Sequence, residues 1–249
     1  MAIVWIFRAA AARSVRMITV VIPTLNAETS LAATLTSLVS GAVDGLVCQV
    51  VIVDGGSSDR TLRVAEDSGA DIVRAEPGRG SQMRAGVAAA RFPWLLFLHA
   101  DTVLDPGWER EAATFVERVD IGQRPLSAAA FRFALDDMGF LPRMIEAGVA
   151  LRCMLLRLPY GDQGLLIPRR LYDQVGGYKP LPLMEDVDLV RRLGRSRTLI
   201  LRTQAVTSAM RYKRDGYLPR VARNLTCLGL YFMHAPMPLI QRLYGRRAQ

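Results

Sequence analysis

Two carboxylates stand at the ends of apolar segments, where they could bind or activate a ligand. Asp101 follows the apolar run 94–98 through His99 and Ala100, and Asp54 ends a similar run at 50–53. Short apolar runs of this kind are typical of buried strands. In an open α/β sheet, ligands bind at the edge formed by the carboxyl ends of the strands. The sequence therefore predicts that both acids lie at one ligand-binding edge.

The chemistry that such an acid favours is divalent-metal binding. Carboxylate oxygens suit Mg²⁺ or Mn²⁺, and the ion would bridge the phosphates of a ligand. We expect Asp101 to be the metal ligand and His99 to support it by hydrogen bonding. Each motif alone also has a structural explanation. His99–Asp101 could cap a buried strand, and Asp54 with its glycines and serines could form an ordinary strand-to-helix turn.

Two further motifs could complete the site. Segment 78–84 combines backbone amides with two arginines at a helix start, which suits phosphate or a planar base, but it is neither a P-loop nor a dinucleotide fingerprint. Segment 183–189 places Glu185 and Asp186 side by side, after the glycine-rich approach 161–164. A plain helix entry, favourable to acids because of the helix dipole, is the competing explanation for the acidic pair.

The elements that must position these residues alternate between extended and helical as far as residue 101. Such alternation implies crossover connections and a mostly parallel central sheet flanked by helices. Strands are predicted at 17–22, 49–53, 71–74 and 94–98, and helices near 28–40, 59–68 and 81–91. Farther on, strands are predicted at 128–135, 165–167 and 198–202, and helices at 106–119, 139–157, from 168, from 185, at 216–233 and at 237–246.

Composition indicates one sizeable folded unit. The chain has 249 residues, 51% of them hydrophobic, and no apolar run approaches the roughly 18–20 residues that span a bilayer, so we expect a cytoplasmic protein. Three cysteines in apolar surroundings predict buried thiols. We divide the chain into an N-terminal extension at 1–16, with Met17 as a possible start of translation, a catalytic domain at 17–210, and a basic helical C-terminal segment at 211–249.

The C-terminal segment carries most of the positive charge. Residues 191–249 hold 13 Lys and Arg against one acid, in a chain whose net charge is +9. Arginines interleaved with apolar residues could form an amphipathic surface that contacts anionic lipid, peripheral to the inner face of the membrane. Alternatively, the helices pack on the catalytic body and leave the arginines in solvent. No nucleic-acid partner is expected, because no recognition module is present.

Taken in order, the motifs resemble glycosyltransferase family 2. Val20–Glu28 resembles the opening strand of the family, Val53–Asp59 its first nucleotide-binding acid, His99–Asp101 its metal motif, and Met184–Asp186 its catalytic acid. The resemblance spans about residues 17–215. The residues at 98–101, 161–164 and 182–186 are most similar to those of a small bacterial subgroup associated with arsenosugar biosynthesis.

The resemblance implies a nucleotide-diphospho-sugar transferase fold of the GT-A type. It also implies inverting, metal-dependent transfer of a sugar from a nucleotide-diphospho-sugar, most simply a UDP-sugar, to the hydroxyl of an unidentified acceptor. Asp186 would be the general base with Glu185 beside it, and Asp101 would ligate Mg²⁺ or Mn²⁺. The residues implied to contact the nucleotide-sugar are Pro23, Asn26, Glu28, Asp54, Gly55, Arg79, Gln82, His99 and Ala100; those implied on the acceptor side are Gly161, Asp162 and Gln163.

Two other functions stay open at this stage. The metal motif of the family usually begins with Asp, where this chain has His99. If metal binding is lost for that reason, the protein would be a catalytically silent nucleotide-sugar binding protein. A nucleotidyltransferase on a similar fold is the other alternative, but it would need a glycine-rich, arginine-containing loop after the first strand, and segment 23–26 is not one.

Overall fold

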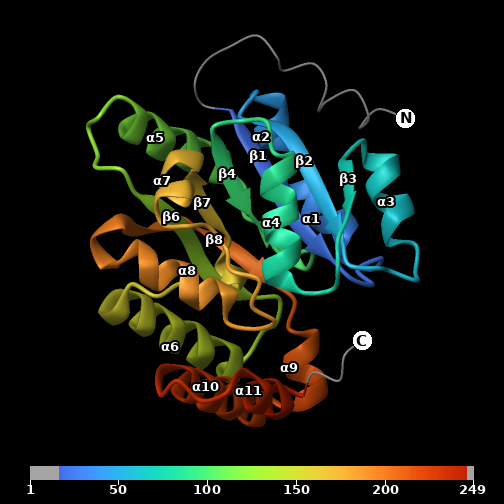
Figure 1. Ribbon diagram of the computed structural model, residues 1–249, viewed down its shortest axis with the longest axis vertical. Coiled ribbons are helices and arrows are strands. Elements are labelled where there is room, and N and C mark those ends of the chain that lie inside the picture. The colour runs from blue at the N-terminus through green and yellow to red at the C-terminus, as the bar shows by residue number, and fades with distance from the viewer. Residues whose placement is uncertain (1–16, 246–249) are drawn as a thin grey trace.

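The computed structural model describes residues 17–245 and shows a mixed α/β fold with one central eight-stranded sheet (Figure 1). The strand order is β3-β2-β1-β4-β7-β6-β8-β5. The N-terminal extension at 1–16 and the last residue of the helix predicted at 237–246 lie outside the described residues.

The first half of the sheet is parallel, as the alternation of strands and helices predicts. It consists of β1 (Ile18–Thr24), β2 (Val47–Asp54), β3 (Asp71–Arg74) and β4 (Trp94–Phe97). The connecting helices are α1 (Leu31–Ser37), α2 (Val39–Val43), α3 (Thr61–Ser68) and α4 (Arg79–Ala89). The first helix begins later than the predicted residue 28, because Asn26 has a positive φ of 52° and a turn occupies the next residues.

The second half of the sheet is mixed. It contains β5 (Thr102–Leu104), β6 (Ala128–Leu135), β7 (Leu165–Pro168) and β8 (Thr198–Thr207). Strand β7 runs antiparallel to β4 and β6, β6 is parallel to β8, and β5 is antiparallel to β8. The three-residue strand β5 escapes prediction because it is too short to show a period. The parallel arrangement therefore holds for the half of the sheet that ends in Asp54 and the His99–Asp101 motif.

Helices cover both faces of the sheet, and each strand sends alternate side chains to two cores. Val20 and Ile52 belong to one cluster with residues of α1 and α5 (Trp108–Asp120). Val21 and Val51 belong to the other with residues of α4, α7 (Arg169–Gln174) and α8 (Glu185–Leu193). The sheet is thus a rigid support for the loops at its edge.

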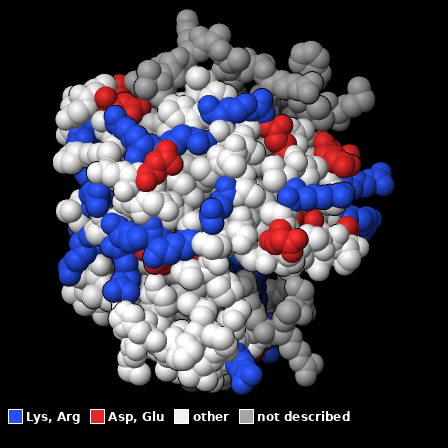
Figure 2. All heavy atoms as spheres, viewed as in Figure 1, with Lys and Arg blue, Asp and Glu red and all other residues white. Residues whose placement is uncertain are grey.

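A group of helices lies at one end of the molecule, the lower end in Figure 1. It consists of α6 (Phe140–Leu156), α9 (Met210–Asp215), α10 (Tyr217–Phe232) and α11 (Met237–Tyr244). Short 3₁₀ turns at Gly161–Gln163 and Arg195–Arg197 complete the described elements. Figure 2 shows charges of both signs over the upper part of this view and few at the lower end.

Two predictions from composition can be checked against this fold. Cys48, Cys153 and Cys227 are buried and free, as expected from their apolar surroundings. Within residues 17–245, no helix combines the length and apolar character needed to cross a membrane.

Candidate active site

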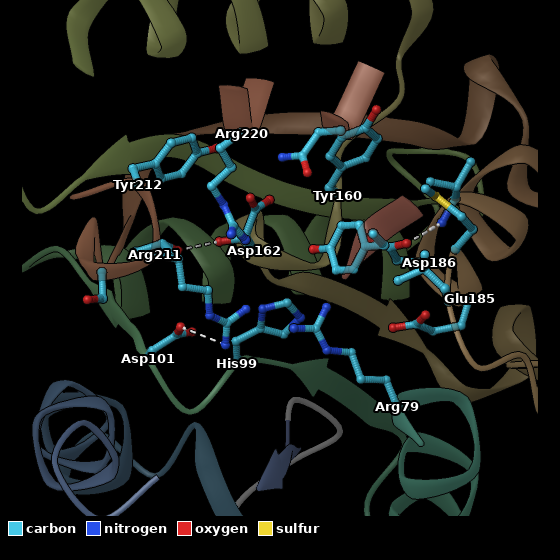
Figure 3. Close-up of a pocket in the computed structure, with 17 residues that line it drawn as sticks. Arg79, His99, Asp101, Tyr160, Asp162, Glu185, Asp186, Arg211, Tyr212 and Arg220 are labelled. Atoms are coloured by element: carbon cyan, nitrogen blue, oxygen red, sulfur yellow. Dashed lines mark hydrogen bonds and ion pairs between the residues drawn. The ribbon is translucent and has the colours of Figure 1, made fainter. Parts of the chain in front are cut away.

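A cavity of about 110 Å³ lies between the end of β4 and the helices α8 to α11 (Figure 3). Several residues that the sequence singled out line it, and they come from distant parts of the chain: Arg79, His99, Asp101, Asp162, Glu185 and Asp186. The fold therefore brings the proposed metal ligand and the proposed catalytic acids into one site.

Asp101 is held where β4 passes into β5. Its backbone carbonyl accepts a hydrogen bond from the N–H of Ser208 (3.1 Å), and the hydroxyl groups of the next residue, Thr102, and of Thr207 are 2.9 Å apart. The carboxylate faces the cavity, where the guanidinium of Arg211 from α9 lies 3.5 Å away. The fixed backbone thus presents a carboxylate whose partner is a cation from the C-terminal helices.

His99 is a neutral imidazole at this edge. Burial and the cationic neighbours Arg79 and Arg211 lower its pKa to about 3, although Asp101 opposes the shift. A neutral imidazole can accept a hydrogen bond or donate a lone pair through its unprotonated nitrogen. His99 therefore brings no positive charge to the cavity at neutral pH.

Asp186 lies at the start of α8, and two backbone N–H groups hold its carboxylate. Its Oδ2 accepts a hydrogen bond from Gly161 (2.7 Å) and its Oδ1 from Val187 (2.7 Å). The helix begins at Glu185, preceded by Met184 in the left-handed conformation with φ of 63°. That conformation is uncommon for a non-glycine residue, and such strain concentrates at functional sites.

Gly161 joins the two acidic parts of the site. A Cβ atom at this position would lie 2.7 Å from Nε2 of His99 and 3.3 Å from Oδ2 of Asp186. Only glycine leaves room for these two side chains to approach the same turn. Gly161, predicted on the acceptor side, is therefore a point of contact between the His99–Asp101 motif and the start of α8.

Arg79, the first residue of α4, lies between the acids. Figure 3 shows Asp101 and Asp186 toward opposite sides of the cavity, with the guanidinium of Arg79 directed into the space between them. Burial opposes its charge, but Glu185, Asp186 and Asp101 outweigh that effect and raise the pKa of Arg79. A permanent cation at this position suits a phosphate-bearing ligand.

The cavity also holds buried polar atoms without a hydrogen-bonding partner. Oδ1 of Asp162, Nε of Arg220 and Oδ1 of Asn224 are such atoms, and all three residues line the cavity. Burial raises the pKa of Asp162 to about 6, with Asp186 and Asp101 adding to the shift. Buried polar groups are normally satisfied, so these atoms indicate a polar ligand with hydrogen-bond donors and acceptors.

Several residues predicted to contact the nucleotide-sugar lie outside the cavity lining and connect loops, and their contact with that ligand stays a prediction. Oδ1 of Asn26 accepts a hydrogen bond from the N–H of Ser58 (2.9 Å). Glu28 accepts bonds from the backbone N–H (3.0 Å) and Nε (2.8 Å) of Arg60. These bonds attach the loop after β1 to the loop after β2, and so they fix the shape of the sheet edge.

Asp54 is saturated by its own surroundings. Its carboxylate accepts bonds from the N–H groups of Gly56 and Ser57 (2.9 Å each), from the hydroxyl of Thr24 (3.1 Å) and from the hydroxyl of Ser57. Burial opposes ionisation, but these bonds outweigh it and lower the pKa of Asp54. All four acceptor positions are then occupied. Contact of Asp54 with a nucleotide base stays a prediction.

The remaining predicted residues hold the backbone around the site in place through hydrogen bonds, close packing and sheet pairing. Nε2 of Gln82 donates to the carbonyl groups of Thr24 and Val53 (2.8 Å each), and a Cβ at Gly55 would meet the Gln82 side chain at 3.1 Å. Pro23 pairs with Val53 within the sheet, and the carbonyl of Ala100 accepts a bond from Thr34 (3.0 Å). Nε2 of Gln163 donates to the carbonyl of Phe131 (2.9 Å), which anchors the 161–163 turn.

The sequence did not identify one wall of the cavity. Tyr160, Thr207 and Ser208 contribute to the lining, together with Arg211 and Tyr212 of α9, Arg220 and Asn224 of α10, and Tyr244 of α11. The dense positive charge after residue 190 was the available signal, but charge alone does not show which arginines face inward. The C-terminal helices are therefore part of the site.

A divalent ion fits the residues present, provided that the ligand supplies further oxygen atoms. Among residues 17–245, no three His, Cys, Asp or Glu side chains are arranged to hold a metal by themselves. Mg²⁺ is commonly bound through one or two carboxylates together with substrate phosphates. Asp101, which faces the cavity, is a donor of this kind, and Arg211 would have to move away from it.

Comparison with solved structures shows the class of fold. The crystal structure of Mycobacterium tuberculosis glucosyl-3-phosphoglycerate synthase superposes with a TM-score of 0.58 at 21% identity, over 95% of this chain and 86% of that one. Residues 1–349 of Staphylococcus aureus TarS give 0.59 at 16% identity, over 92% and 69%. The protein has a fold of the GT-A type, a mixed α/β fold with a central sheet flanked by helices.

Sequence comparison finds similarity to one family. Residues 19–132 match the model of glycosyl transferase family 2. An uncharacterised glycosyltransferase of M. tuberculosis is 40% identical over 91 residues, which are 36% of this chain and 39% of the relative. The glucosyl-3-phosphoglycerate synthase of that species is 34% identical over 102 residues, 37% and 31% of the two chains. The chain thus spans about two fifths or less of these relatives.

Proposed function

We propose that this protein is an inverting, metal-dependent glycosyltransferase that moves a sugar from a nucleotide-diphospho-sugar to an acceptor hydroxyl. The observation that carries the proposal is the placement of Asp101 and Asp186 in one cavity, on opposite sides of the Arg79 guanidinium. Inversion requires the acceptor oxygen to attack the anomeric carbon from the side opposite the departing diphosphate. Two acids separated in this way suit the two ends of that reaction.

Asp186 is the proposed general base. The acceptor oxygen forms its bond to the anomeric carbon, the bond from that carbon to the diphosphate breaks, and the acceptor proton passes to the carboxylate. Hydrogen bonds from Gly161 and Val187 orient Asp186 for this transfer. Glu185, which also lines the cavity, shapes the acceptor side.

The donor diphosphate is proposed to lie near Asp101 and Arg79. A divalent ion held by Asp101 would neutralise negative charge on the leaving nucleoside diphosphate. Arg79 places a second positive charge beside that leaving group. On this view Arg211 moves from Asp101 toward the phosphates when donor and ion bind, because its guanidinium otherwise holds the carboxylate.

A UDP-sugar with Mn²⁺ or Mg²⁺ is the proposed donor pair. Solved structures of glucosyl-3-phosphoglycerate synthase with this fold contain Mn²⁺, UDP and glucosyl-3-phosphoglycerate in one case and Mg²⁺ with UDP in another.

We also propose a cytoplasmic setting. The motifs at 98–101, 161–164 and 182–186 support membership of the bacterial subgroup associated with arsenosugar biosynthesis.

The test is a screen of nucleotide-sugars with Mn²⁺ or Mg²⁺ that measures donor binding by calorimetry and nucleotide release. Asp186→Asn should retain donor binding and lose turnover by roughly a hundredfold or more, because it removes the base. Asp101→Asn should weaken metal-dependent donor binding. Asp173→Asn, an exposed acid at the end of α7, is the matched control and should behave as the parent does.

Parental turnover in both site variants would contradict the assignment. Donor binding without any turnover in the parent would instead favour the silent nucleotide-sugar binding protein, the alternative raised by His99.

A further inference from the structure

The outer face of α6 is apolar where an ordinary surface helix is polar. Phe140, Met144, Leu151 and Met154 recur at helical spacing, and each is more than half exposed. The inner face already packs on the protein through Ile145 and Val149. Arg143 is the one charged residue at an exposed position of this helix. Such a helix normally shows its charged residues to water, so a second apolar face needs a partner.

Helix α10 repeats the pattern beside it. Leu218, Leu225 and Phe232 are seven residues apart and exposed on one side, and none of the exposed residues of α10 is charged. Helix α10 contacts both α6 and α11, which adds exposed Leu239 and Leu243. We call the exposed faces of α6, α10 and α11 the apolar end surface. It accounts for the sparse charge at the lower end of the molecule in Figure 2.

The charges around the apolar end surface are positive toward solvent. The side chains of Arg143, Lys213 and Arg214 are 56%, 57% and 75% exposed. Their acidic partners Glu146, Asp137 and Asp215 are 14%, 22% and 17% exposed, and each is engaged in an ion pair. In these three pairs water therefore meets the cation more than the acid, and Asp136, just before α6, is an exposed acid beside them. An apolar face flanked by exposed cations complements an anionic lipid surface.

We propose that the apolar end surface docks onto an anionic lipid bilayer. Helices α10 and α11, which carry part of this surface, also form a wall of the cavity. On α10, Arg220 and Asn224 face inward while Leu218 and Leu225 face outward. The cavity then lies about one helix diameter, roughly 10 Å, from the lipid. Resting on the proposed function, this places an amphiphilic acceptor within reach, with its hydroxyl-bearing head in the cavity and its apolar part in the bilayer.

The experiment is flotation of the full chain with phosphatidylcholine vesicles that contain phosphatidylglycerol. The parent should float with these vesicles, and recovery should fall with pure phosphatidylcholine or with added salt. The double variants Met144→Glu with Leu151→Glu, and Leu218→Glu with Leu225→Glu, should each lower vesicle partitioning by roughly tenfold or more. The matched control is Val43→Glu with Ile121→Glu, which also charges two exposed apolar residues but on α2 and after α5.

Failure of the parent protein to float with the vesicles would overturn the proposal. An equal loss of vesicle partitioning in the control variant would also overturn it. Sedimentation that shows a dimer abolished by the same variants, without flotation, would assign the surface to a second copy and also overturn it. Circular dichroism on every variant checks that it is folded. Calorimetric donor binding on every variant separates the docking hypothesis from the proposed glycosyltransferase function. Donor binding retained with flotation lost supports docking, whereas absence of donor binding in the parent contradicts the proposed function and leaves docking standing.

Discussion

At the scale of single residues, the hydrogen bonds and ion pairs around each carboxylate determine its role in the site. Asp186 is one acid among several in its stretch of chain, and the backbone N–H groups of Gly161 and Val187 hold its carboxylate in place. Asp188, two residues on, is instead paired with Lys179 (3.0 Å) and Arg192. Neighbouring acids of one helix therefore have different tasks, one at the cavity and one in anchoring the preceding loop.

Gly161→Ala should impair catalysis more than stability. The new Cβ would meet Nε2 of His99 at 2.7 Å and so displace the imidazole or Asp186. A small displacement of reacting groups costs rate, and we expect turnover to fall by roughly tenfold or more. Nucleotide release and the urea midpoint should be measured together. Gly229→Ala, which has no heavy atom within 4 Å of the added Cβ, is the control. Equal turnover in parent and Gly161→Ala would contradict this account.

Asp162→Asn should change how stability depends on pH. The folded-state pKa of Asp162, raised to about 6 by burial, lies above its ordinary value of 3.8. Its protonated form is favoured on folding, so its stabilising contribution is complete below about pH 4 and is lost as pH rises through about 6. The shift corresponds to roughly 3 kcal/mol.

The measurement is the free energy of urea unfolding in metal-free buffer, at about pH 4 and about pH 7. The asparagine variant should gain stability relative to the parent at the higher pH, because it carries no charge to bury. Asp173→Asn, which removes an exposed acid of α7, is measured alongside as the control. A constant difference for Asp162→Asn would mean that its carboxyl is not buried in its charged form.

At the scale of elements, close packing of α4 on the sheet sets where Arg79 enters the cavity. A Cβ at Gly86 would lie 2.3 Å from Val21 and 2.9 Å from Val53, and one at Gly80 would lie 2.3 Å from the carbonyl of Lys179. Glycines at these two points let α4 approach β1 and β2 on one side and the chain before α8 on the other.

Gly86→Ala should destabilise the fold by roughly 1–3 kcal/mol, because the helix must move away from the sheet. Gly148→Ala in α6 is the matched control, since nothing lies within 4 Å of its added Cβ. There, the better helix propensity of alanine should raise stability by up to about 1 kcal/mol. Urea unfolding of both variants would decide, and equal effects would contradict the close approach of α4.

At the scale of the whole molecule, the C-terminal helices are joined to the rest of the described chain by shared cores. Leu228 and Tyr231 of α10 pack with Val187 and Val190 of α8. Cys227 packs with Leu183, in the loop that leads to the proposed catalytic acids. The separate segment that the sequence suggested after residue 210 therefore contributes to the same packed structure as the site.

The three buried thiols can test whether the C-terminal helices unfold together with the rest of the described chain. Cys48 lies in β2, Cys153 in α6 and Cys227 in α10, and burial raises the pKa of each thiol. If the described chain unfolds cooperatively, alkylation resolved by mass spectrometry should give one urea midpoint for all three. Cys48, in the central sheet, is the internal reference. A lower midpoint for Cys227 alone would show that the C-terminal helices unfold independently.

The parallel half of the sheet and the acids at its edge follow from sequence because each signal is local. An apolar run that ends in Asp54 or in His99–Asp101 contains both the strand and its terminal acid. The roles of Asn26, Glu28 and Gln82 do not follow in this way. Their hydrogen bonds go to Ser58, Arg60, Thr24 and Val53, partners that depend on how two loops and a helix meet.

The sequence by itself determined the α/β class, the order of the chemical motifs and the positive charge of the C-terminal segment. Periodicity, turn residues and charge are properties of neighbouring residues, so they can be read along the chain. Only the tertiary structure decided that Arg211, Arg220 and Asn224 line the cavity while Leu218 and Leu225 face outward. Periodicity separates Arg220 and Asn224 from Leu218 and Leu225 on α10, but it would ordinarily turn the polar side to water; packing against other elements reverses that orientation here.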